Sequence, residues 1–367
     1  MTVFPCGTAQ NTAPQHGPRP LPLFIDMLRR ETAASPERRA AALAGLRRYQ
    51  EAPRTVRRMK PARYRKGAAR LRDHRTGGDT GLPPVVFVPS LINPPFVLDL
   101  APGRSLVGHV AAAGFPAWLV DWGSPRPQDA GLDLAGHVTD RLLPLIAKLE
   151  RPPVLVGYCL GGTLALAAAQ LLGDRVAGVV TIAAPWRFAG YGEAARAALA
   201  TLWHETGPAS RALGVLPMEV LQTAFWRLDP ARTVAKYEAF ATMDAERAAT
   251  FVLLEDWANG GAPLTHAAGA DLFDTLVAQD RPGQGEWRVG GMVIDPAALR
   301  CPAAEFVSLS DRIVPAATAA GLADRRDLAM GHVGMVMGGG AKGAVWDPLV
   351  ESLREWTVTS PQQPAQK

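Results

Sequence analysis

The chain has 367 residues, a length that fits about two to three domains or one large α/β domain with an insertion. Since 48% of its residues are hydrophobic and 20% are charged, it can bury a large core. The net charge is +5, and the excess is local, because Arg29–Arg75 holds 16 Arg and Lys residues and 4 Asp and Glu residues. Three widely spaced cysteines exclude a disulfide framework and a zinc pattern, and they favour a reducing, cytoplasmic compartment.

The first residues are expected to form a tail followed by short helices. Residues 1–20 are Pro-rich and polar, which predicts disorder, and they lack the basic start and apolar run of a signal peptide. Two short helices are predicted within 21–50, the second with Ser35 as its N-cap and Pro36 at its first position.

A basic extension, residues 21–80, precedes the core in this interpretation. Its second part, Ala52–Gly81, is expected to be loop-like. Such a segment can meet nucleic acid, an anionic surface or a phosphorylated ligand. No nucleic-acid motif accompanies it, so a solvated basic surface is favoured.

No apolar run reaches about 20 residues, and we therefore expect no membrane span.

Short apolar runs separated by helical patterns begin at Pro84. The predicted strands are 85–90, 115–122, 153–158, 176–185 and 303–311. The helical patterns between them are 103–114, 131–150 and 161–173. Strands that alternate with helices predict a mostly parallel sheet flanked by helices. The core is assigned to 81–185 and 301–360, and the largely helical segment 186–300, with five of the nine tryptophans, is predicted to be a cap inserted between late strands.

The turn after the third predicted strand carries a cysteine. "GYCLGG" places Cys159 between a strand and a helix, as Gly-x-Cys-x-Gly, which is the nucleophile-elbow pattern of α/β-hydrolases with Cys in place of Ser. Gly157 and Gly161 are expected to let neighbouring backbones approach without a Cβ clash. A buried, inert cysteine in a Gly-rich turn is the alternative for this stretch alone.

Two later residues complete the order nucleophile, acid, histidine that this fold uses. Asp311 follows the predicted strand 303–311, and His332 lies in "MGHVGMVMGG" before the last helix. Taken alone, Asp311 could cap a helix and His332 could be an ordinary loop histidine; their joint order predicts a Cys159–Asp311–His332 triad. Oxyanion donors are expected at the backbone N–H groups of Leu160 and Leu91, with Ser90 as the next candidate.

With these segments together, the sequence resembles the polyhydroxyalkanoate synthases, and is most similar to their class III catalytic subunit. The resemblance is carried by "VPSLINPPFVLDL", "WLVDWGSP", "GEWRVGGMVIDPAALRCP" and "GHVGMVMGGGAKGAVWDPLVESLREW". It implies that Cys159 carries the acyl chain, that His332 is the base and that Asp311 works with His332. It further implies an α/β-hydrolase fold and a cytoplasmic, granule-associated enzyme that polymerises 3-hydroxyacyl-CoA to a polyester.

The resemblance implies no separate cofactor, because CoA is part of the substrate and a product. It is compatible with a homo-oligomer or a helper subunit, and it implies neither a metal nor nucleic acid. Two alternatives stay open. One is a cysteine hydrolase of a lactone, ester or thioester, since "GYCLGG" also matches the box of dienelactone hydrolases. The other is a catalytically silent protein, either associated with granules or acting as a partner subunit.

Overall fold

The computed structural model describes residues 16–53 and 57–359, so Cys6 and the first 15 residues of the predicted tail lie outside the described residues. The chain divides into two compact units. One comprises the described part of Met1–Arg57 together with Asp229–Asn259. The other comprises Arg58–Leu228 and the described part of Gly260–Lys367, and it contains the central sheet and the candidate site.

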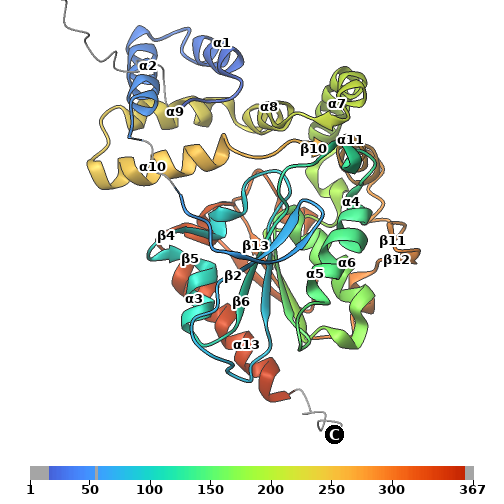
Figure 1. Ribbon diagram of the computed structural model, residues 1–367. Coiled ribbons are helices and arrows are strands. Elements are labelled where there is room, and N and C mark those ends of the chain that lie inside the picture. Colours follow the sequence, from blue (N-terminus) through green and yellow to red (C-terminus); the bar gives the residue numbers. More distant parts are fainter. Residues whose placement is uncertain (1–15, 54–56, 360–367) are drawn as a thin grey trace, which may run out of the picture. The chain divides into compact units, whose positions relative to one another are not determined.

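The sheet of the larger unit has eight strands in the order β1-β2-β6-β3-β7-β8-β13-β14 (Figure 1). They are β1 (Ala62–Lys66), β2 (Ala69–Asp73), β3 (Val85–Val88), β6 (Ala117–Asp121), β7 (Val154–Tyr158), β8 (Gly178–Ile182), β13 (Ala303–Ser308) and β14 (Asp324–Leu328). From β6 to β14 all pairs are parallel. The predicted α/β-hydrolase architecture, a mostly parallel sheet flanked by helices, is confirmed.

The five predicted strands are present because each is a short run of apolar residues. Every residue of β3, β6, β7 and β8 is buried, as expected of strands that helices cover on both faces. Strand β14, "DRRDL", was not predicted, because its sequence is mostly charged and lacks an apolar run. It lies at the edge of the sheet, where its residues alternate between partial and full exposure.

The expectation of a loop over Ala52–Gly81 is wrong for its central part. Strands β1 and β2 form an antiparallel hairpin, and β2 pairs with β6, so the sheet begins at Ala62 within the predicted extension 21–80. The hairpin forms because apolar and charged residues alternate along β2, so that Ala69 and Leu71 are buried on one face. On the same face Tyr64 stacks on Trp118, with ring centroids 5.7 Å apart.

Helices of the larger unit cover both faces of the sheet. Figure 1 shows α4, α5 and α6 on one side and α3 and α13 on the other. These are α3 (Leu106–Ala112), α4 (Leu134–Gly136), α5 (Leu143–Ile146), α6 (Leu160–Leu172) and α13 (Asp347–Thr359). The predicted helices 103–114, 131–150 and 161–173 therefore exist, the second interrupted by a π-helical segment at His137–Leu142. A shorter helix, α12 (Gly334–Met337), follows His332.

The segment 186–300, expected as one insertion, is mostly helical but divides between the units. Residues 186–228 and 260–300, here called the cap segments, belong to the larger unit, and residues 229–259 to the smaller one. The cap helices are α7 (Glu193–Leu213), α8 (Met218–Leu228) and α11 (His266–Ala270). Short pairs accompany them: β9 (Val215–Leu216) with β10 (Leu264–Thr265), and β11 (Arg288–Val289) with β12 (Met292–Val293).

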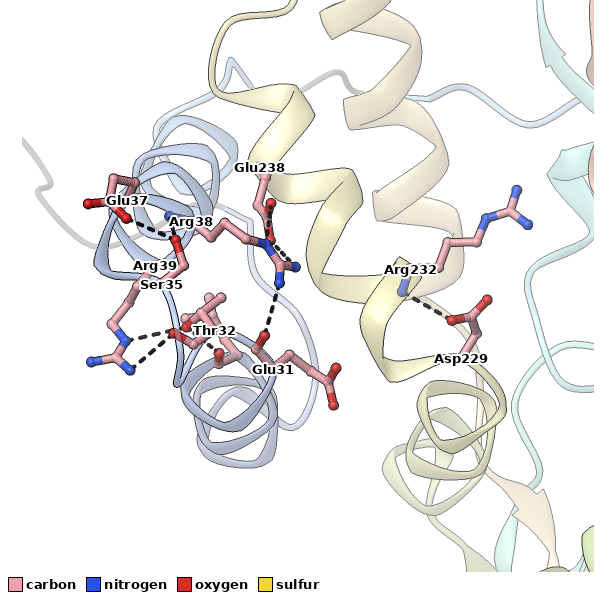
Figure 2. Close-up of polar contacts among 10 residues, drawn as sticks. Glu31, Thr32, Ser35, Glu37, Arg38, Arg39, Asp229, Arg232 and Glu238 are labelled. Carbon is pink, nitrogen blue, oxygen red and sulfur yellow. Dashed lines mark hydrogen bonds and ion pairs between the residues drawn. The ribbon is translucent and has the colours of Figure 1, made fainter.

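The smaller unit packs four helices around aromatic residues. They are α1 (Leu21–Glu31), α2 (Pro36–Gln50), α9 (Pro230–Phe240) and α10 (Ala245–Ala258). The predicted start of α2 is confirmed: Pro36 is its first residue, and the Ser35 side chain accepts a hydrogen bond from the Arg38 N–H. Arg38 also forms an ion pair with Glu238 of α9 at 2.9 Å (Figure 2), so a carboxylate of α9 neutralises part of the positive charge of α2.

Candidate active site

Cys159 occupies a sharp turn between β7 and α6. Its φ is 55° and its ψ is −135°, a left-handed conformation that costs energy for any residue with a Cβ. The turn leaves the Cys159 side chain partly exposed, at the edge of the sheet where the parallel strands end. A strained, accessible cysteine in this position is what the elbow pattern predicts.

The glycines around Cys159 are required by close backbone contacts. A Cβ on Gly161 would lie 2.1 Å from the Val88 carbonyl oxygen, and one on Gly157 would lie 2.4 Å from the Cα of Gly162. The expected close approach at Gly157 and Gly161 is confirmed. The contact at Gly161 holds the start of α6 against the loop that follows β3.

Asp311 and His332 meet although they are 21 residues apart. The Asp311 Oδ2 is 2.6 Å from the His332 Nδ1, and both side chains are buried. The other oxygen, Oδ1, accepts hydrogen bonds from the N–H groups of Ile313 (2.7 Å) and Val314 (3.0 Å). The loop after β13 therefore fixes the carboxylate, and the carboxylate orients the imidazole.

The electrostatic surroundings of His332 favour its protonated form. Burial opposes the charge, but the negative charges of Asp311 and Cys159 and side-chain hydrogen bonds with both raise the pKa of His332 to about 10. The ring of Tyr158 also packs against it, with centroids 5.0 Å apart. The structure thus brings the three residues of the predicted triad into one cluster, in which Nδ1 bonds the carboxylate and the imidazole interacts with the thiol.

The two predicted oxyanion donors lie on either side of the Gly161 contact. Leu160 is the first residue of α6, where a helix N–H has no partner within the helix. Leu91 is buried in the loop after β3, and this loop is tied down by a hydrogen bond from Trp122 Nε1 to the Pro89 oxygen at 3.0 Å. The Ser90 hydroxyl accepts a bond from its own loop, from the N–H of Ile92 at 3.2 Å.

Two tyrosines near the site were missed by the sequence analysis. Burial, and then the charges of Cys159 and Asp311, raise the pKa of Tyr158 and of Tyr191 well above the usual value, so both phenols stay protonated. Tyr158 directly precedes the nucleophile, a signal that could have identified it. Tyr191 ends a short 3-10 segment in the cap and carries no such signal.

A buried carboxylate supports the connection between Asp311 and His332. Glu305 of β13 is 2% exposed, and its oxygens accept backbone N–H bonds from Ala320, Gly321 and Leu322 at 2.9 to 3.1 Å. These bonds hold the segment that leads into β14. Sequence analysis had no reason to single out Glu305, because it lies within an otherwise apolar strand.

The residues that the structure describes contain neither a metal-ligand cluster nor a membrane-length apolar helix. Within them, no group of three or more His, Cys, Asp or Glu side chains is arranged to hold a metal ion. In the same residues, no helix combines the length and the apolar composition needed to cross a bilayer.

The sequence matches known proteins over most of its length. A family model described as the alpha/beta hydrolase fold matches residues 83–259. The poly(3-hydroxyalkanoate) polymerase subunit PhaC of Haloferax mediterranei is 26% identical over 313 residues, which is 81% of this chain and 64% of that protein. Its counterpart from Synechocystis sp. is 26% identical over 279 residues, 70% of this chain and 73% of that one. The chain thus spans slightly less than two thirds of the Haloferax protein.

Among solved structures, the monoacylglycerol lipase of Paleococcus ferrophilus superposes with a TM-score of 0.48 and 16% identity, over 75% of this chain and 96% of the lipase. The family match, the curated relatives and the sheet topology agree on the fold. The chain therefore has the α/β-hydrolase fold, and its sequence is similar to those of the poly(3-hydroxyalkanoate) polymerases.

Proposed function

We propose that the protein is a cysteine-dependent acyltransferase that polymerises 3-hydroxyacyl-CoA into a polyester and releases CoA. The observation that carries this proposal is the cluster of Cys159, His332 and Asp311 at the strand–helix turn. The relatives named as poly(3-hydroxyalkanoate) polymerases support the choice of reaction. No separate cofactor enters the proposal.

In the first step the Cys159 sulfur attacks the carbonyl carbon of the acyl-CoA. The new carbon–sulfur bond gives a tetrahedral oxyanion, which collapses as the bond to the CoA sulfur breaks. His332 holds the proton that came from the thiol and delivers it to the departing CoA thiolate. The raised pKa of His332 suits this role, because the imidazolium retains its proton until it transfers that proton to the departing CoA thiolate.

In the second step the 3-hydroxyl group of another hydroxyacyl unit attacks the Cys159 thioester. His332 removes the hydroxyl proton, an oxygen ester forms, and the Cys159 thiolate leaves. Asp311 keeps the ring in the tautomer that presents its other nitrogen to the reacting atoms. The N–H groups of Leu160 and Leu91 stabilise each oxyanion, with about 2.7–4 kcal/mol for each donor.

Polymerisation requires that water be kept from the thioester, and we assign that task to the cap segments. Three tryptophans of the cap segments are buried (Trp186, Trp226 and Trp287). Their burial indicates that they pack the interior. Trp203 stacks on Phe273 with centroids 5.2 Å apart, which ties α7 to the segment after α11.

Incubation with 3-hydroxybutyryl-CoA tests this function. Polymerisation predicts free CoA together with insoluble polyester, and Cys159→Ala should abolish both. Release of CoA with free 3-hydroxybutyrate and no polymer would assign the protein to the cysteine hydrolases instead. CoA release that Cys159→Ala leaves unchanged would refute a covalent role for the cysteine.

A further inference from the structure

A row of arginines at the outer end of the sheet has more positive charge than its surroundings neutralise. Arg70 and Arg72 of β2 both bond the same oxygen of Asp121, at 3.4 and 2.6 Å. Arg65 of β1 lies directly opposite Arg70. Within the described chain no carboxylate pairs with Arg65, which is exposed. Arg65, Arg70 and Arg72 are here called the arginine row, and the one carboxylate bonded within it, Asp121, pairs with Arg70 and Arg72.

Protection of an edge strand does not account for this arrangement. Strand β1 is the edge of the sheet, and exposed charges there discourage pairing with other chains. Protection of the edge requires charged residues on β1, but it does not require arginines on the neighbouring strand β2. Placing Arg65 opposite Arg70 sets like charges side by side on one face, which destabilises the hairpin. A bound anion would remove that repulsion.

The strand register places Arg65 and Arg70 of the arginine row on the same edge of the sheet as Cys159. Leu119, Phe87 and Val156 are mutual partners across β6, β3 and β7. Two residues further along, Asp121 and Tyr158 therefore lie at one level, and Arg70 pairs with Asp121. Tyr158 directly precedes the nucleophile.

The distance along this edge follows from the strand spacing. Three spacings separate β7 from β2, or about 14 Å, and one more leads to β1. A hollow of about 30 Å³ lies beside the hairpin turn, lined among others by Ala68, Leu91 and Trp122. A ligand that is reactive at one end and phosphorylated at the other would span from Cys159 to the arginine row.

We propose that the arginine row binds the phosphate groups of the acyl donor, at the adenosine 3′,5′-bisphosphate and diphosphate end of CoA. The proposal rests on the proposed function for the identity of the donor. Planar guanidinium groups bind phosphate oxygens bidentately, and Arg65 is free to turn toward a ligand because no described carboxylate holds it.

The test uses Arg65→Gln, with Arg354→Gln on the exposed face of α13 as the matched control. Calorimetric titration with adenosine 3′,5′-bisphosphate measures binding without turnover, and initial rates with 3-hydroxybutyryl-CoA give KM and kcat. Arg65→Gln should weaken bisphosphate binding and raise KM by about fivefold each while kcat stays the same. Arg354→Gln should change none of them. The unfolding temperature of Arg65→Gln should be no lower than that of the parent, since the repulsion from Arg70 is relieved, and that of Arg354→Gln should equal the parent value.

Unchanged bisphosphate affinity in Arg65→Gln, or an equal loss in Arg354→Gln, would overturn the proposal. Arg65-dependent binding of a single-stranded RNA, with KM unaffected, would assign the row to nucleic acid and would also overturn it. The two proposals fail separately. Arg65-dependent bisphosphate binding without any CoA release would refute the polymerase function and keep the phosphate site.

Discussion

At the scale of single residues, the site depends on how Asp311 holds His332. One carboxylate oxygen is fixed by two backbone N–H groups and the other bonds Nδ1, so the ring has one orientation. The charge of Asp311 is the largest favourable contribution to the raised pKa of His332, and it acts against the cost of burial.

Replacing Asp311 with Asn should therefore lower the pKa of His332 from about 10, because the negative charge is lost while burial remains. Titration of ¹³C-labelled histidine by NMR measures this shift, with His332→Gln to assign the signal. Turnover should fall by roughly 10²–10⁴-fold. An unchanged titration would show that the carboxylate does not govern the ring.

The same substitution predicts how stability depends on pH. The folded protein binds the His332 proton more tightly than the unfolded chain does, because the pKa of His332 is raised from 6.5 to about 10 on folding. The resulting stabilisation is fully present below about pH 6.5 and is lost as the pH rises toward 10. The unfolding free energy of the parent should exceed that of Asp311→Asn by about 1–3 kcal/mol at pH 6. Urea unfolding at pH 6 and pH 10 should show this difference shrinking at the higher pH; a constant difference would contradict the assignment.

At the scale of elements, the start of α6 packs against the loop after β3, and these two segments carry the proposed oxyanion donors. Gly161 stands where the helix start meets the carbonyl oxygens of Val88 and Pro89. Both are backbone atoms, so neither can turn aside for a methyl group.

Gly161→Ala should push the Leu91 loop away from Leu160. We expect a loss of about 1–3 kcal/mol in unfolding free energy and a drop in kcat, because one oxyanion donor moves. Thermal unfolding and steady-state rates measure both. Gly78→Ala is the matched control, since a Cβ there meets nothing within 4 Å and should leave both quantities unchanged. Equal behaviour of the two variants would refute the importance of this contact.

The cap segments provide a second test at this scale. The Trp203 ring stacks on Phe273, and its Nε1 donates to Asp274 at 2.9 Å. Trp203→Ala should loosen α7 and admit water, so the ratio of free 3-hydroxybutyrate to polyester should rise. Trp203→Phe keeps the stacking and should leave the ratio near the parent value. If both variants give the parent ratio, the cap segments do not control water access.

At the scale of the whole molecule, the sequence predicted what local patterns encode. The apolar runs gave the buried strands, and Gly-x-Cys-x-Gly gave the elbow, because sterics alone demand those glycines. The hairpin β1–β2 and strand β14 escaped prediction, since charged edge strands lack an apolar run. The partners Tyr191 and Glu305 depend on the tertiary arrangement, which no local pattern reports.

The division of 186–300 shows the same limit for domain organisation. Helical patterns in the sequence identify the helices but not their packing partners. Helices α9 and α10 pack with α1 and α2, about 200 residues away, through contacts such as the ion pair of Arg38 and Glu238. Gly45 allows α2 and α9 to approach, since a Cβ there would lie 1.9 Å from the Tyr237 oxygen.

In the proposed reaction, Cys159 carries the acyl chain as a thioester. Rapid acid quenching after mixing with 3-hydroxybutyryl-CoA, followed by peptide mass spectrometry, measures it directly. We expect a hydroxybutyryl adduct on the peptide containing Cys159, absent from Cys159→Ala and accumulating less in His332→Gln. CoA release at the normal rate with no adduct on Cys159, or with the adduct on Cys301, would contradict it.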